Sequence, residues 1–190
     1  AYIEHFPNGM FRFEPEPTIA RHEQIFQIWI RPLEVPTAHF GLRLAMYELD
    51  QLIKNGLTEA DFQATKSYLT KYVNLLTKSK SVELGYAIDS RFYGIPDYGE
   101  YIKSSLAKLT LKDVNNAIRK HFRSDRIVIV AIARDAEQLR DKIVSNEPSA
   151  MEYNSPKPEA VLAQDKIVAT YRLPIRAEQV KIVPVETVFE

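Results

Sequence analysis

The middle of the chain carries apolar residues at a helical spacing. Between residues 37 and 55 these residues recur at i, i+3 or i+4, and i+7, which places them on one face of a helix. They are Leu42, Ala45, Leu49, Leu52 and Ile53. A second stripe consists of Phe62, Leu69, Val73 and Leu76. The pattern predicts two helices that lie roughly antiparallel, as a helical hairpin within residues 37–93.

The residues between the two stripes mark where one helix ends and the next begins. Gly56 follows Asn55 at the position of a left-handed helix cap, because glycine adopts positive φ without a Cβ clash. The hydroxyl of Thr58 can then accept a hydrogen bond from a free N–H of the second helix. Glu59 and Asp61 place negative charge at the positive end of that helix dipole.

Other stretches are typical of β-strands. Residues 2–6 and 10–13 flank a Pro-Asn-Gly turn and indicate a β-hairpin, and residues 24–31 favour a strand. Residues 126–133 are β-branched and nearly all apolar, which is typical of a strand covered on both faces. We therefore expect an α+β fold, with a mainly antiparallel sheet and the helices of residues 37–93 as a layer on one face.

Further helices are expected after the hairpin, up to about residue 145. Helical spacing resumes at residue 82 and stops at Gly94-Ile95-Pro96, and residues 98–109 fit a short helix. Thr110 caps the next one, and Asp135 begins a last helix with a capping-box pattern. From residue 146 proline recurs and the helical period is lost, so residues 146–190 are expected to form an extended arm beside a domain of residues 1–145.

Composition excludes some classes of function. The chain has 190 residues, with 25 Lys and Arg against 25 Asp and Glu, and this zero net charge argues against nucleic-acid binding. It has no cysteine, which excludes disulfides and fits a bacterial cytoplasm or periplasm equally. No apolar run reaches the length of a membrane span, so we expect a soluble protein. Because it opens on Ala1-Tyr2 without an initiator methionine, we expect a fragment of a longer parent.

The order of these elements resembles a known family. The strand at 26–31, the helix at 42–55 and the sequence Gly56-Leu-Thr-Glu-Ala-Asp-Phe-Gln-Ala-Thr-Lys66 resemble the second half of a domain of the pitrilysin/insulinase family of zinc metallopeptidases. Gly94-Ile-Pro96, residues 109–114 and residues 126–130 extend the resemblance, which covers residues 24–143. It implies half of a clamshell in which two similar α/β domains close around an unfolded peptide. This chain would then be the C-terminal, non-zinc portion.

The family's zinc motif is not found in this chain. That motif is His-x-x-Glu-His, in which two imidazoles one helical turn apart hold zinc and the glutamate acts as general base. His5, His22, His39 and His121 do not match it. We interpret the first three as surface or partly buried packing residues and His121 as the end of a helix, where imidazolium favours the dipole. Zinc is therefore expected in the parent or on a paired catalytic chain, and this chain alone is predicted to be inactive.

No catalytic, substrate-binding or metal-binding residue is assigned from the sequence. The resemblance implies an Arg…Gly-x-x-Tyr pair that binds substrate, but Tyr2 cannot be placed in it without the arginine. One group of aromatic residues could line a peptide cleft, although their helical spacing favours the core: Tyr68, Tyr72, Tyr86, Phe92, Tyr93, Tyr98 and Tyr101. The alternatives are an inactive structural or assembly subunit related to the family, and an unrelated protein-interaction module. The residues upstream of Ala1 would distinguish these readings.

Overall fold

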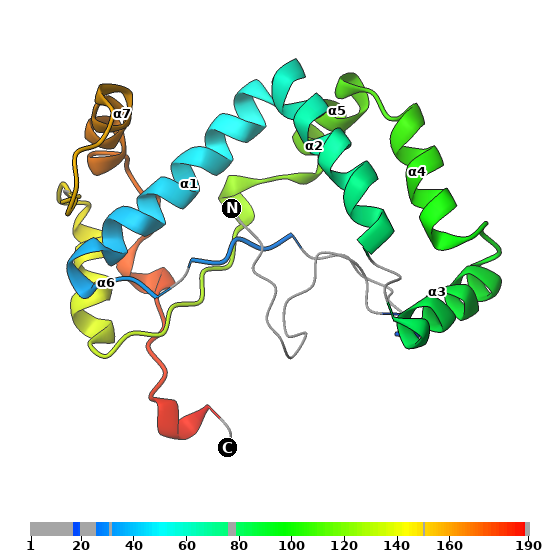
Figure 1. Cartoon of the computed structure of the whole chain (residues 1–190). Helices are drawn as coiled ribbons and strands as arrows, with labels where there is room; N and C mark the ends of the chain where they lie inside the picture. Colours follow the sequence, from blue (N-terminus) through cyan, green and yellow to red (C-terminus); the bar gives the residue numbers. More distant parts are fainter. Residues whose placement is uncertain (1–16, 20–25, 31, 76–78, 150, 189–190) are drawn as a thin grey trace. The chain divides into compact units, whose positions relative to one another are not determined.

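The computed structural model describes residues 17–19, 26–30, 32–75, 79–149 and 151–188, and every regular element in these ranges is a helix (Figure 1). The α-helices are α1 (Ala38–Asn55), α2 (Glu59–Tyr72), α3 (Lys80–Tyr93), α4 (Tyr98–Lys108), α5 (Leu111–His121), α6 (Ala136–Ser145) and α7 (Glu159–Ala169). Short 3-10 turns are η1 (Val35–Thr37), η2 (Val73–Leu75), η3 (Ser124–Arg126), η4 (Ala177–Gln179) and η5 (Val185–Thr187). Within the described ranges, none of these helices is both long enough and apolar enough to cross a membrane.

The chain divides into two compact units. One unit comprises Ile28–Gln51 with Arg123–Glu190, and the other comprises Tyr2–Gln27 with Leu52–Phe122. Each unit therefore combines segments that are far apart in the sequence, and each is described by itself below.

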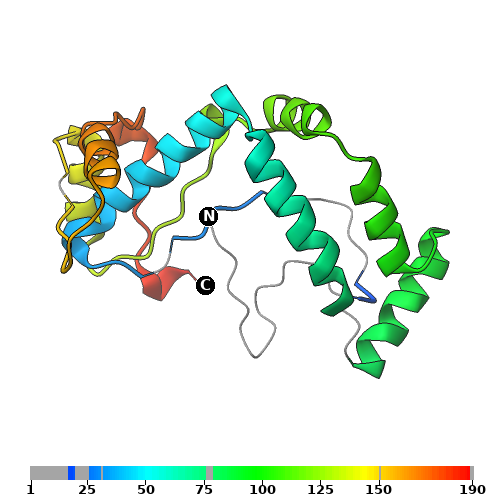
Figure 2. The ribbon, with the colours of Figure 1, turned by 45° about the horizontal axis from the view of Figure 1, so that its top comes forward.

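The unit that contains most of α1 has its core between α1, α6 and the segment after α7. Met46, Ile143 and Leu173 form this core and are at most 9% exposed. Figures 1 and 2 both show α6 and α7 beside α1, and a hydrogen bond from Gln164 on α7 to Glu48 on α1 links two of these helices. Residues after position 146 thus complete this core.

The other unit is built from α2, α3, α4 and α5. Helix α4 contacts both α2 and α3. The rings of Tyr86 on α3 and Tyr98 on α4 stack with their centroids 4.2 Å apart. Phe62 on α2 and Ile118 on α5 are buried as well, at 5% and 7% exposure.

The helix ends follow local chemistry, and the predicted caps are confirmed. Gly56 has φ +72° directly after α1, and Gly94 has φ +66° directly after α3. The Thr58 hydroxyl accepts a hydrogen bond from the N–H of Asp61 at 3.1 Å. Thr110 forms a complete capping box with Asp113. Most of α1 belongs to one unit and α2 belongs to the other. Whether these two hairpin helices pack antiparallel depends on how the units are placed, so it stays a prediction.

The predicted antiparallel sheet is wrong, because the structure is helical and has no strand in the part of the chain that it describes. Residues 26–30 and 127–133 belong to no regular element, and the hairpin expected at residues 1–13 lies outside the described residues. Val128 and Val130 are each 86% exposed and Ile132 is 101% exposed, so the run is not covered on both faces. Alternating β-branched residues favour an extended backbone, but a strand also needs a partner to bond with.

The tail after residue 145 contains a helix where the sequence indicated an extended arm. Helix α7 begins directly after Pro158, which sits at its N-cap, a position that needs no intrahelical N–H donor. Val168 on this helix is completely buried, and Leu173 beyond it is 2% exposed. The prolines therefore lie at the ends of the helical segment rather than excluding one. The division of the chain at residue 145 stays a prediction.

Candidate functional site

The residues that carry the family resemblance make structural contacts inside one unit. Lys66 Nζ donates hydrogen bonds to the carbonyl oxygens of Ala107 at 3.2 Å and Leu109 at 3.0 Å. Asn115 accepts from the N–H of Leu57 at 2.8 Å and donates to its carbonyl oxygen at 3.2 Å. These bonds tie α2 to the end of α4 and the α1–α2 turn to α5. The motif residues thus position helices.

The described histidines do not form a metal site. His121 is the last residue of α5 and is exposed, as expected for a helix C-terminus, and His39 lies buried on α1. His5 and His22 lie outside the described residues. Among the residues whose placement is given, no group of three or more His, Asp or Glu side chains could hold a metal ion.

Two basic residues, Arg43 and His39, are buried near the beginning of α1. Arg43 is 0% exposed, and its Nη1 donates to Ser149 Oγ at 3.0 Å and to the Ala169 carbonyl oxygen. Its Nε and Nη2 are buried without a hydrogen-bond partner in the described structure. A buried guanidinium that is only partly compensated reduces stability, although the bonds that it does make fix the tail to α1. Arg43 therefore acts as a clamp within its unit.

His39 precedes Arg43 by one helical turn and is 4% exposed. Its pKa falls from 6.5 to about 4, mainly because burial disfavours the charged imidazolium and then because Arg43 and Lys142 repel it. The imidazole is consequently neutral at pH 7. Since the ring is enclosed by protein, it cannot exchange protons with a substrate, and we assign it no catalytic role.

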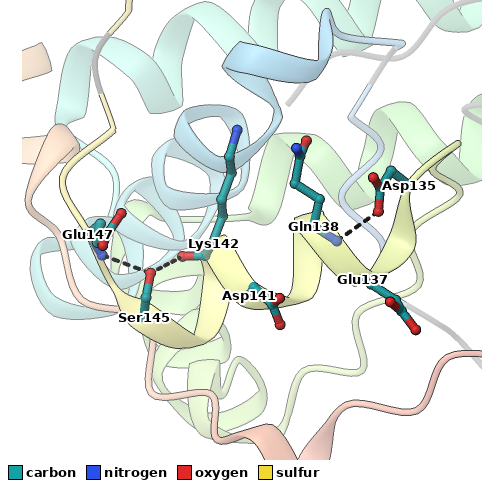
Figure 3. Close-up of a pocket in the computed structure, with 7 residues that line it drawn as sticks. All are labelled: Asp135, Glu137, Gln138, Asp141, Lys142, Ser145 and Glu147. Carbon is teal, nitrogen blue, oxygen red and sulfur yellow. Dashed lines mark hydrogen bonds between the residues drawn. The ribbon is translucent and has the colours of Figure 1, made fainter.

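An acidic hollow follows α6 and has a volume of about 430 Å³ (Figure 3). Its lining residues are Asp135, Glu137, Gln138, Asp141, Lys142, Ser145 and Glu147. Asp135 is used as a helix cap, because it accepts a hydrogen bond from the Gln138 N–H at 2.9 Å. Asp141 pairs with Arg140 at 2.8 Å, and the carboxylates in Figure 3 do not converge on one point. The hollow is a solvated helix face.

The most prominent surface feature of the other unit is an apolar stripe along α3. Leu84, Ile88 and Phe92 are 62%, 51% and 77% exposed, and they recur every fourth residue, so they lie on one helix face. The sequence analysis did not single out Leu84 or Ile88, and it favoured the core for both Phe92 and Tyr86. Six residues are not a whole number of helical turns, so Phe92 and Tyr86 lie on different faces of the helix. This spacing was the feature of the sequence that could have separated the two residues.

A groove of about 410 Å³ runs beside this stripe, lined by Pro17, Thr18, Ser81, Val82, Leu84, Gly85 and Ile88. Thr18 has the positive φ of 68°, and its N–H donates to both carboxylate oxygens of Asp89, at 3.1 and 2.9 Å. A Cβ on Gly85 would lie 2.7 Å from Pro17, so glycine permits this close approach. These contacts place Pro17 and Thr18 against α3, where they form one wall of the groove.

The aromatic residues singled out in the sequence divide between core and surface. Tyr86 is 3% exposed and belongs to the core, as its spacing favours. The core interpretation is wrong for others, since four of them have exposed side chains: Tyr68, Phe92, Tyr93 and Tyr101. Because these four side chains reach the surface, the cleft alternative stays a prediction for this subset.

Comparison of the chain with protein-family models, curated proteins and solved structures found no match. The functional argument below therefore rests on the chain's own residues. Of the surfaces described, only the α3 stripe combines large exposed apolar side chains with a groove.

Proposed function

We propose that this chain forms part of the peptide-binding wall of a two-part zinc peptidase that resembles the pitrilysin/insulinase family. The zinc and the general base belong to the missing half of the parent or to a paired catalytic chain. The observation that carries the proposal is the exposed stripe of Leu84, Ile88 and Phe92 beside the groove on α3.

The chemistry of this face suits an unfolded peptide. The stripe offers apolar area to side chains that a folded protein would keep buried, and burying each one contributes about 1.5–3 kcal/mol before ordering costs. The groove supplies a concave edge, in which Ser81 and the backbone near Gly85 lie beside the apolar side chains. An extended peptide with apolar residues could use both features at once.

The structural contacts of the motif residues support a non-catalytic role. Lys66 is occupied by hydrogen bonds to the backbone of Ala107 and Leu109, which tie α2 to the end of α4. The backbone of Leu57 is likewise bound by the Asn115 side chain. The segments that resemble the family would then act as a scaffold for the proposed binding surface, and not as catalytic groups. Hydrolysis would need the catalytic groups of the other half.

Peptide binding can be measured by fluorescence anisotropy. We expect the chain to bind a fluorescein-labelled unfolded peptide rich in leucine and phenylalanine, and to bind a Gly/Ser peptide of equal length at least about tenfold more weakly, a difference of about 1.4 kcal/mol. The variant Leu84→Ser/Ile88→Ser should lose that preference. The matched control Leu162→Ser changes an exposed leucine (44%) on α7 and should retain it. Equal binding of both peptides, or a binding-competent double variant, would refute the proposal.

A second candidate function is an assembly subunit without catalytic activity. The observation that favours it is the exposed apolar run at residues 127–133. This run lies in the unit that contains most of α1, and peptide binding at α3 would not involve it. The two candidates make different demands on the chain, since one needs the α3 stripe and the other needs this run.

A further inference from the structure

A short strap lies along the edge of the groove on α3. It consists of Pro17 and Thr18, which belong to the same unit as α3, and Figures 1 and 2 both show this segment beside that helix. Both residues line the groove together with Leu84 and Ile88 of the exposed stripe. The strap therefore lies on the face to which the proposed function assigns the peptide.

The strap binds α3 through groups that an extended peptide also has. The backbone N–H of Thr18 donates to both carboxylate oxygens of Asp89, at 3.1 and 2.9 Å, whereas its hydroxyl donates to the carbonyl oxygen of Pro17 at 2.6 Å. Every residue except proline has a backbone N–H, so the contact with Asp89 does not depend on the threonine side chain. Pro17 lies over Gly85, where a Cβ would come within 2.7 Å of the proline Cβ. Gly85 and Asp89 thus form a subsite for one residue and the N–H that follows it.

This subsite and the exposed stripe share one side of α3. Helical residues four positions apart are neighbours, so Gly85 and Asp89 form one row, and Leu84, Ile88 and Phe92 form the row beside it. A peptide that lies along α3 can therefore present a backbone N–H to Asp89 while its apolar side chains cover the stripe. The carboxylate is a suitable acceptor, because hydrogen bonds to a charged group are stronger than those between neutral groups.

The strap is bound in a strained conformation. Thr18 has φ +68°, in the left-handed region that a β-branched residue rarely adopts. Release of the strap lets this backbone return to an ordinary conformation, so the strain opposes the hydrogen bonds to Asp89. A peptide residue need not adopt that φ to present its N–H. The strain therefore favours exchange of the strap for a peptide.

We propose that Pro17 and Thr18 form an autoinhibitory strap that competes with the peptide, and that Asp89 binds a peptide N–H once the strap is released. This inference rests on the proposed function, because it concerns the regulation of the same binding face. A closed strap reduces the apparent affinity for peptide in proportion to the fraction of molecules in which the strap is open.

Two substitutions at Thr18 shift the strap in opposite directions. Thr18→Pro removes the N–H donor and fixes φ at about −65°, so the strap should open. Thr18→Gly keeps the donor and adopts positive φ without strain, so the strap should close more firmly. For the fluorescein-labelled peptide rich in leucine and phenylalanine, we expect Kd to fall at least about threefold in the first variant and to rise at least about threefold in the second. Helix content by circular dichroism should be the same in both, because Thr18 lies outside the helices.

The role of Asp89 is tested in the opened chain. In the Thr18→Pro background the strap no longer donates to Asp89, so Asp89→Ala removes the contact proposed for the peptide and should raise Kd at least about fivefold. The matched control Glu83→Ala changes an exposed carboxylate on the same helix and should leave Kd unchanged. An unchanged Kd in the Asp89 variant would overturn the assignment of this residue.

A reversible lock tests the competition directly. The natural chain has no cysteine, so Pro17→Cys/Gly85→Cys introduces two thiols at positions whose Cβ atoms lie close together. The oxidised form, identified by its mass, should bind the peptide at least about tenfold more weakly than the reduced form. The single variant Pro17→Cys cannot form this bond within one chain and should bind equally under both conditions.

The outcomes distinguish this inference from the proposed function. Equal binding by the oxidised and reduced lock, or an unchanged Kd in both Thr18 variants, would overturn the strap and leave the proposed function standing. Absence of peptide binding by the wild type and by the opened Thr18→Pro chain would overturn the proposed function, and this inference with it.

Discussion

The buried His39 makes the stability of its unit depend on pH. In the folded protein its pKa is about 4, against 6.5 in the unfolded chain, because burial and the charges of Arg43 and Lys142 disfavour the imidazolium. Between these two values the unfolded chain binds one more proton than the folded chain. Lowering the pH therefore favours unfolding, and the stability present above the unfolded pKa is lost as pH falls toward the folded pKa.

The magnitude follows from the difference between the two pKa values. Each pH unit in this window changes the free energy of unfolding by about 1.4 kcal/mol per proton. From pH 6.5 down to about 4 the loss amounts to about 3 kcal/mol. Domains of this size have only about 5–15 kcal/mol of stability, so the effect is readily measurable.

Urea unfolding followed by Trp29 fluorescence measures this effect in the relevant unit, because the only tryptophan lies in the same unit as His39. The wild type should lose stability between about pH 7 and about pH 4.5, whereas His39→Gln should be nearly flat over that window. The control His121→Gln changes an exposed histidine at the end of α5 and should keep the wild-type slope. A wild-type slope in His39→Gln, or an NMR titration of His39 near its ordinary pKa, would refute the reasoning.

Other predictions concern the turn, the core and zinc. Gly56→Ala should lower the free energy of unfolding by about 1–3 kcal/mol in thermal denaturation, because φ is +72° and the new Cβ would lie 2.6 Å from Asn115. Gly94→Ala, at φ +66° but with open space around the new Cβ, should lower it less. Leu173→Ala should lower the free energy of unfolding by about 2–5 kcal/mol and the exposed Leu162→Ala by far less, so equal losses would show that the tail is not docked. Purified chain should retain substoichiometric zinc after dialysis and leave a quenched fluorogenic peptide intact; stoichiometric zinc would contradict this.

The helices were predictable where their signals are local. Gly56, Thr58 and Thr110 act through backbone groups within a few residues, so the sequence alone contains both partners of each contact. The predicted strands were wrong, because a strand depends on more than local signals. The β-branched run at 127–133 expresses a preference for extended backbone, but its partner has to come from elsewhere, and in the described structure none is present.

The docked tail depends on contacts that no sequence window contains. Arg43 meets Ser149 and Ala169, which are 106 and 126 residues away along the chain. Tyr171 donates a hydrogen bond to Asp50 across a similar separation. The recurring prolines suggested an extended arm, yet Pro158 occupies a helix start where proline is well tolerated. A proline therefore indicates where a helix cannot continue, and it does not exclude a helix immediately after it.

The α3 surface shows why the candidate site was harder to predict than the helix that carries it. Two apolar stripes follow the helical period on α3, one through Val82 and Tyr86 and the other through Leu84, Ile88 and Phe92. Periodicity assigns both to helix faces, but it does not say which face the rest of the unit covers. Tyr86 is buried because Tyr98 on α4 stacks on it, a contact between helices. Once that face is covered, the second stripe faces outward, and its exposed apolar side chains form the surface that we propose for peptide binding.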